Sequence, residues 1–212
     1  MSEKEKKQST NISRRSFLKG VGTGTVAATV VPAILVGDAE KAEAQTDDTI
    51  STAQIQLAIN EQKYTIEVEA RTTLLSVLRD GIDTNGNSVD LTGAKLICDR
   101  GECGGCTVLV DGKPIYACMM LAMDAQGKQI TTVEGIADGN TLHPVQEAFI
   151  KHDALMCGFC TPGFVVSSVA LLNENKKPTL EEIKNGLSGN TCRCGTYPFI
   201  FDAVETAAQK MK

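Results

Sequence analysis

Four cysteines gathered around one short, glycine-rich stretch constrain this chain more than any other feature. Cys98, Cys103 and Cys106 follow a C-x4-C-x2-C spacing, and Cys118 comes after a further eleven residues. This is the spacing of plant-type loops that hold a [2Fe-2S] cluster, in which four thiolates converge on two irons. The stretch therefore predicts a [2Fe-2S] site with these four cysteines as iron ligands.

Three glycines in the same stretch are expected to contact the cofactor. Glycine adopts positive φ without strain, and it lets backbone N–H groups approach the sulfur atoms closely. We therefore expect Gly101, Gly104 and Gly105 to form the lining of the first cluster.

A second set of cysteines uses all the remaining thiols. Cys157 and Cys160 form a CxxC pair, and Cys192 and Cys194 form a distant CxC pair. Together with the first set they account for all eight cysteines of the chain. Taken alone, the second set also fits a structural zinc site, and eight cysteines in a secreted protein also fit four disulfides. The choice between an iron–sulfur cluster, zinc and disulfides depends on the compartment, because disulfides persist in oxidising compartments.

The N-terminus predicts export in the folded state. Residues 13–19, SRRSFLK, match a twin-arginine signal. The apolar run that follows is too short and too diluted for a membrane span, and residues 42–44, Ala-Glu-Ala, supply a cleavage site. We expect residues 1–44 to be a signal peptide, the alternative being an uncleaved membrane anchor, and residues 45–53 to be a linker. The mature protein is then periplasmic. Because this pathway carries folded, cofactor-loaded proteins, it favours metal clusters over disulfides and zinc.

Residues 54–134 are predicted to form a β-grasp domain that contains the first cysteine set. Residues 54–59 and 64–69 alternate apolar and polar side chains, which predicts a β-hairpin. The other expected elements are a helix over 73–78, a polar loop over 83–90, a strand over 107–110, a return strand over 114–121 that carries Cys118, and a strand over 129–133.

Residues 142–212 change to a helical pattern around the second cysteine set. Apolar residues at helical spacing predict a first helix from Pro144 to Met156, and Thr161 is expected to cap the next. Thr179 and Glu182 form a capping box for a third helix, and apolar residues from 200 to 208 predict a fourth. The fold class is therefore α+β: a plant-type ferredoxin-like β-grasp domain followed by a four-helix-bundle [2Fe-2S] domain.

Composition and missing motifs exclude other functions. A net charge of −5 and no Trp argue against nucleic-acid binding. No Ser/His/Asp set, phosphate loop or dinucleotide fingerprint is present, so we expect no catalytic residue on this chain. His143 and His152 are expected to serve as capping or surface residues. Arg193, between two ligands, either raises a cluster potential or pairs with a carboxylate.

The motifs together resemble the iron–sulfur subunit of molybdenum hydroxylases, the group of xanthine dehydrogenases, aldehyde oxidoreductases and isoquinoline oxidoreductases. The matching motifs are CDRGECGGC at 98–106, LHPVQEAF at 142–149, CGFCTPG at 157–163 and CRCG at 192–195. With the export signal included, the chain is most similar to the small subunits of periplasmic aldehyde oxidoreductases.

The resemblance implies cofactors and partners. All eight cysteines would ligate two [2Fe-2S] clusters, and a large partner subunit would bind the molybdopterin cofactor. The cluster of the helical domain would lie nearest the molybdopterin, and the β-grasp cluster would pass electrons to an FAD subunit or a periplasmic cytochrome. No nucleic acid and no stable membrane span after cleavage are expected.

Two positions depart from the family pattern. Met156 stands where the family often has a glutamine that hydrogen-bonds the pterin, and a thioether is a weak acceptor and no donor. Gly105 stands where alanine is common. The loop over 83–90 is also longer than usual.

The predicted function is electron transfer from a molybdenum centre that oxidises aldehydes. One alternative is the same role in a hydroxylase of N-heteroaromatic compounds. A second is a secreted, disulfide-stapled binding module, and a third is a free two-cluster carrier of the ferredoxin type.

Overall fold

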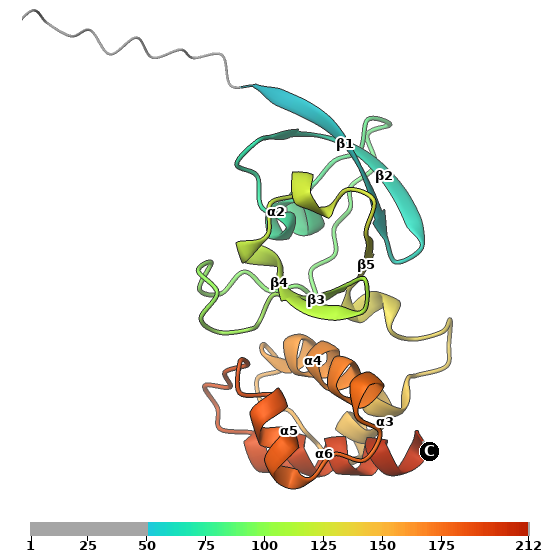
Figure 1. The fold of residues 1–212 in the computed structure, drawn as a ribbon, viewed down its shortest axis with the longest axis vertical. Helices are drawn as coiled ribbons and strands as arrows, with labels where there is room; N and C mark the ends of the chain where they lie inside the picture. Colours follow the sequence, from blue (N-terminus) through green and yellow to red (C-terminus); the bar gives the residue numbers. More distant parts are fainter. Residues whose placement is uncertain (1–50, 212) are drawn as a thin grey trace, which may run out of the picture. The chain divides into compact units, whose positions relative to one another are not determined.

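The computed structural model describes residues 51–211, which belong to one compact unit, Thr49–Lys212. The predicted signal peptide lies outside the described residues. Figure 1 shows a sheet in the first half of this unit and a group of helices in the second half.

The sheet has the β-grasp arrangement that the sequence predicts. Its five strands run in the order β2-β1-β5-β3-β4, with β1 and β5 parallel and the other neighbours antiparallel. A two-residue turn joins the first hairpin, because Asn60 and Glu61 both adopt positive φ. The helix α2 spans Leu74–Asp80 and is capped by the Thr73 side chain. The strands are β1 (Thr52–Ile59), β2 (Gln62–Glu69), β3 (Thr107–Val110), β4 (Lys113–Tyr116) and β5 (Gln129–Thr131).

The return strand that the sequence predicts over residues 114–121 is confirmed only as far as Tyr116. β4 ends at Tyr116, and Cys118 lies on a 3-10 turn, Ala117–Met119. The Ala117 N–H donates to the Cys106 carbonyl at 3.2 Å, and a tight turn at this point brings the two cysteines together. Further 3-10 turns span Met123–Ala125 and Val133–Gly135.

Four helices make up the second half: α3 (Pro144–Lys151), α4 (Thr161–Glu174), α5 (Leu180–Gly186) and α6 (Tyr197–Lys210). α3 ends earlier than predicted, so Met156 lies in a loop and not on the helix. The N-cap of α4 is Cys160 and not Thr161. The capping box of Thr179 and Glu182 is present as predicted.

Each half packs around its own hydrophobic core, and the two cores meet at β3. Val108 and Val110 belong to the core of the sheet, whereas Leu109 packs into the core of the helices. α4 lies against β3, with Phe164 fully buried in the second core. The strand that follows the first cysteine loop is therefore fixed from both sides. None of the helices in residues 51–211 combines the length and apolar character that crossing a membrane requires.

Candidate metal centres

The first cysteine loop runs between α2 and β3 and curls through positive φ at several points. Gly101 and Gly104 have φ of 75° and 67°, as expected for a loop that wraps a cofactor. The Gly101 N–H points at the Cys118 sulfur, 3.3 Å away. Gly105 has no positive φ, but a Cβ there would collide with the side chain of Ile97. Burial raises the pKa of Cys103, and the Gly105 N–H opposes this rise.

In the first set Cys98 interacts with Cys103 and Cys106 interacts with Cys118, and Cys106 is also within range of the Cys103 charge. Burial opposes ionisation of Cys98, but the N–H groups around its sulfur outweigh burial and lower its pKa to about 7. Burial, together with the neighbouring Cys118, raises the pKa of Cys106 to about 12. A metal that replaces these protons relieves the unfavourable ionisation of the buried thiols, as expected of a ligand set.

The second set lies where two helices begin. Cys160 caps α4, and Cys192 comes shortly before α6, where the N–H and hydroxyl of Thr196 lie 3.5 and 3.4 Å from its sulfur. Burial raises the pKa of Cys160 to about 12. Burial acts the same way on Cys192, but the contacts from Thr196 outweigh it and lower the pKa to about 7. Helix N-termini favour the negative charge of thiolates.

The other two thiols of this set, those of Cys157 and Cys194, are exposed at the surface. Met156 and Phe159 beside them are also exposed, at 56% and 51%. This part of the site is therefore open to a partner molecule.

The contacts between thiols fit a two-iron cluster: Cys98 with Cys103 and Cys106 with Cys118 in the first set, and Cys160 with Cys192 in the second. Among the described residues, no three His, Cys, Asp or Glu side chains gather in a way that could hold one metal ion. A [2Fe-2S] cluster with four cysteines places two protein thiolates on each iron, so pairs are the expected unit. All eight cysteines lie in residues 51–211 and none of them forms a disulfide.

The histidines have the ordinary roles that the sequence predicts. His143 caps α3, with Nδ1 accepting from the Val145 N–H at 3.2 Å, and burial lowers its pKa. His152 contacts the Thr206 hydroxyl at 2.7 Å. Arg193 is exposed and forms no ion pair within residues 51–211, so the second of its two alternative roles, pairing with a carboxylate, is not found there.

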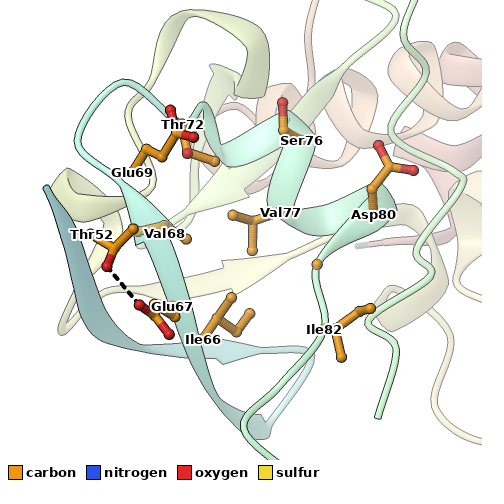
Figure 2. A pocket seen from close by; sticks show the side chains of 11 residues that line it. Thr52, Ile66, Glu67, Val68, Glu69, Thr72, Ser76, Val77, Asp80 and Ile82 are labelled. Carbon is orange, nitrogen blue, oxygen red and sulfur yellow. Dashed lines mark hydrogen bonds between the residues drawn. The ribbon is translucent and has the colours of Figure 1, made fainter. Parts of the chain in front are cut away.

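A groove of about 510 Å³ between β2 and α2 contains none of the cysteines (Figure 2). Of its carboxylates, Glu67 accepts from the Thr52 hydroxyl at 2.6 Å, and Glu69 pairs with Arg71 at 2.7 Å. The third carboxylate, that of Asp80, forms no hydrogen bond or ion pair within residues 51–211. One carboxylate without a second reactive group beside it makes no reactive centre, so the groove is a boundary between sheet and helix.

Sequence reasoning missed the residues that connect the two cysteine loops. The Thr191 N–H donates to the Cys103 carbonyl at 2.9 Å, Tyr116 donates to the Gly189 carbonyl at 2.9 Å, and Asn190 reaches Gly104. The only available signal was that Asn190 and Thr191 immediately precede Cys192.

Comparison with known proteins assigns both halves to the same chemistry. A family described as "2Fe-2S iron-sulfur cluster binding domain" matches residues 51–161, and one described as "[2Fe-2S] binding domain" matches residues 132–205.

Full-length relatives extend this assignment. The chain is 38% identical to the aldehyde oxidoreductase iron-sulfur-binding subunit PaoA of Escherichia coli O157:H7, over 95% of this chain and 90% of the relative. Its fold matches that of quinoline 2-oxidoreductase from Pseudomonas putida 86 with a TM-score of 0.68 and 39% identity, over 74% of this chain and 94% of the other. The aldehyde oxidoreductase of Desulfovibrio desulfuricans matches with a TM-score of 0.67 and 40% identity, over 74% of this chain but only 17% of the other.

These matches agree with the fold and with the two sets of four cysteines. The chain carries two [2Fe-2S] clusters, and the molybdopterin cofactor belongs to its partner subunit. The chain therefore belongs to the molybdenum hydroxylase family, as the non-catalytic iron–sulfur subunit that transfers electrons.

Proposed function

We propose that this chain serves a periplasmic complex whose large subunit oxidises aldehydes, and that all eight cysteines ligate iron. The observation that carries the aldehyde assignment is the similarity to an aldehyde oxidoreductase iron–sulfur subunit over 95% of the chain. The twin-arginine motif at residues 13–19 supports export.

The chemistry of the complex sets what this subunit must do. Oxidation of an aldehyde with water gives a carboxylic acid, two protons and two electrons. Each [2Fe-2S] cluster accepts one electron at a time, so the pair leaves in single steps. An FAD subunit or a periplasmic cytochrome receives these electrons in the proposed complex. The role of this chain is to hold the two clusters between donor and acceptor.

The large subunit is proposed to cover the surface around the exposed thiols of the second set. Beside Cys157 lies a groove of about 370 Å³ with an almost wholly apolar lining, which includes Ile150, Leu155 and Pro162. Exposed apolar surface next to a functional group is typical of an interface. In the Desulfovibrio enzyme the same fold is 17% of one polypeptide, so there the rest of the chain is available to cover it.

Met156 is proposed to contact the pterin of the large subunit from this surface. Its half-exposed side chain stands directly before Cys157. A thioether packs against a ring system but donates no hydrogen bond. The contact at this position is therefore one of packing.

Metal analysis of the natively purified complex tests the proposal. We expect about four irons and four acid-labile sulfides per chain, two distinguishable S = ½ EPR signals after reduction with dithionite, and molybdenum in a co-purifying larger subunit from the periplasmic fraction. A colourless chain without iron would refute the cluster assignment. Gel filtration that shows the chain alone, with both clusters, would favour a free carrier.

Hydroxylation of N-heteroaromatic compounds is the second candidate, and the fold match to quinoline 2-oxidoreductase favours it. Turnover of the two classes of substrate distinguishes aldehyde oxidation from hydroxylation of N-heteroaromatic compounds. The purified complex is offered benzaldehyde and quinoline with the same artificial electron acceptor, and only aldehyde turnover agrees with the proposal.

A charge placed on the proposed interface should weaken assembly with the large subunit. Ile150 is 65% exposed and lines the apolar groove, so Ile150→Glu would bury a carboxylate against apolar surface. We expect the dissociation constant to rise at least about tenfold, which is about 1.4 kcal/mol. Co-purification and titration calorimetry with the large subunit measure the change.

Ile82→Glu is the matched control. Ile82 is 61% exposed, but it lies in the loop after α2, beside the groove of Figure 2. The control should bind the large subunit as tightly as the native chain. Equal weakening by both substitutions, or by neither, would contradict the placement of the interface.

A further inference from the structure

Asn190 lies between the two cysteine loops, and both the nitrogen and the oxygen of its side-chain amide form hydrogen bonds. The residue is only 5% exposed. Its Nδ2 donates to the Gly104 carbonyl at 2.9 Å and lies 3.4 Å from the Thr107 hydroxyl. Its Oδ1 accepts from the Ser167 hydroxyl of α4 at 2.8 Å. One side chain thus joins the first cysteine loop, the start of β3, the helix α4 and the segment that leads into Cys192.

The orientation of this amide follows from the chemistry of its neighbours. The Gly104 carbonyl can only accept, so the NH₂ group of Asn190 must face it, and the amide oxygen must then face Ser167. The Thr107 hydroxyl also donates to the Gly104 carbonyl, at 2.6 Å. The Thr107 N–H donates a third bond to the same carbonyl, at 3.2 Å. A buried carbonyl with these partners is held in place, because losing a partner in a buried network is costly.

Glycines allow the two loops to approach closely at this point. A Cβ on Gly104 would lie 2.5 Å from the Gly189 carbonyl and 2.6 Å from Asn190 Nδ2. A Cβ on Gly163, in α4, would collide with the Gly104 carbonyl, and one on Gly189 would collide with the Tyr116 hydroxyl. The three glycines leave no space between the loops, so any loss of the Asn190 bonds acts directly on their separation.

Asn190 is not needed to ligate iron or to close either hydrophobic core. It belongs to neither cluster of buried apolar side chains. Its bonds cross from one half of the molecule to the other, over 86 positions of sequence. A second crossing bond joins the backbones directly, from the Thr191 N–H to the Cys103 carbonyl, where Cys103 is a proposed ligand and Thr191 precedes another.

We propose that Asn190 is a positioning residue that holds the two cysteine loops, and with them the two clusters, at one fixed separation. The inference rests on the proposed ligation of both clusters by the eight cysteines. Electron transfer between centres falls steeply with distance, so a relay needs one short separation and not a range of them. The hydrogen bonds of Asn190 to the Gly104 carbonyl and to the Ser167 hydroxyl supply that constraint.

The magnetic interaction between the two reduced clusters measures their separation. Two S = ½ centres split each other's EPR lines at low temperature, and the dipolar part of this splitting falls with the inverse cube of the distance. The full chain, loaded with both clusters and fully reduced with dithionite, is compared with Asn190→Ala and Asn190→Asp. The carboxylate of the second variant would face the Gly104 carbonyl without a proton to donate.

We expect both variants to retain about four irons per chain and the g values of each separate signal, but to show a smaller or broadened splitting, outside the scatter of repeated measurements on the native chain. Asn185→Ala is the matched control, since Asn185 is exposed on α5, five positions away, and its side chain forms no hydrogen bond within the described residues. The control should keep the native splitting. If Asn190→Ala does not fold, Asn190→Ser leaves a small polar group in the same place and is measured in the same way.

Native splitting in an iron-replete Asn190 variant would overturn the positioning role, even if that variant unfolds at a lower temperature. A residue with a merely structural role gives that result. Absence of iron in the native chain would instead refute the proposed ligation, so the two failures are distinguishable.

Discussion

Replacement of Cys160 by serine should lower the iron content from about four to about two atoms per chain and remove one of the two EPR signals. Cys160 is the cap of α4 and interacts with the Cys192 thiol. A serine hydroxyl does not ionise near neutral pH, so the iron loses a thiolate ligand. Iron and sulfide analysis with EPR of the reduced protein measures both effects.

Cys106→Ser should also lower the iron content to about two atoms per chain, but it should remove the EPR signal that Cys160→Ser retains. The two losses are expected to be independent because each cysteine set lies against its own hydrophobic core. Ala170→Ser, which adds a hydroxyl to another buried position of α4, serves as the control and should keep both signals. If either cysteine variant kept all its iron, that cysteine would not be a ligand.

The sequence predicted the sheet, the helices and the candidate ligands because each depends on short-range signals. The alternation of residues 54–59 and 64–69 set the first hairpin, and the capping box at Thr179 set the start of α5. The C-x4-C-x2-C spacing predicted a loop that curls at Gly101 and Gly104, and both glycines have positive φ. All of these patterns extend over fewer than about twenty residues.

Features that depend on tertiary contact were missed or wrong. The apolar spacing up to Met156 predicted a longer α3, but the chain leaves the helix at Lys151 and presents Met156 at the surface beside Cys157. Gly105 also makes room for the Ile97 side chain, a contact that no local pattern indicates. No local pattern marks Asn190, because its partner Gly104 is 86 positions away.

Gly104→Ala should be far more harmful than Gly105→Ala, although the two residues are neighbours in one loop. Gly104 has φ of 67°, a conformation that costs alanine about 1–2 kcal/mol. The added methyl group would also lie 2.5 Å from the Gly189 carbonyl, a backbone atom that cannot rotate away. We expect a total loss of about 2–4 kcal/mol, from the strain and from overpacking.

Gly105→Ala should change the stability by less than about 1 kcal/mol, since its φ is ordinary and the colliding group is the end of the half-exposed Ile97 side chain. The midpoint of thermal loss of visible cluster absorbance measures both variants. For a chain of this size, 1 kcal/mol corresponds to about 2–4 °C, so Gly104→Ala should lower the midpoint by about 4–16 °C. A similar shift in the two variants would mean that close approach of the loops at Gly104 does not stabilise the protein. A large shift in Gly104→Ala alone, with the iron retained, would place that stabilisation at the junction of the two halves, where Gly104 meets Gly189 and Asn190.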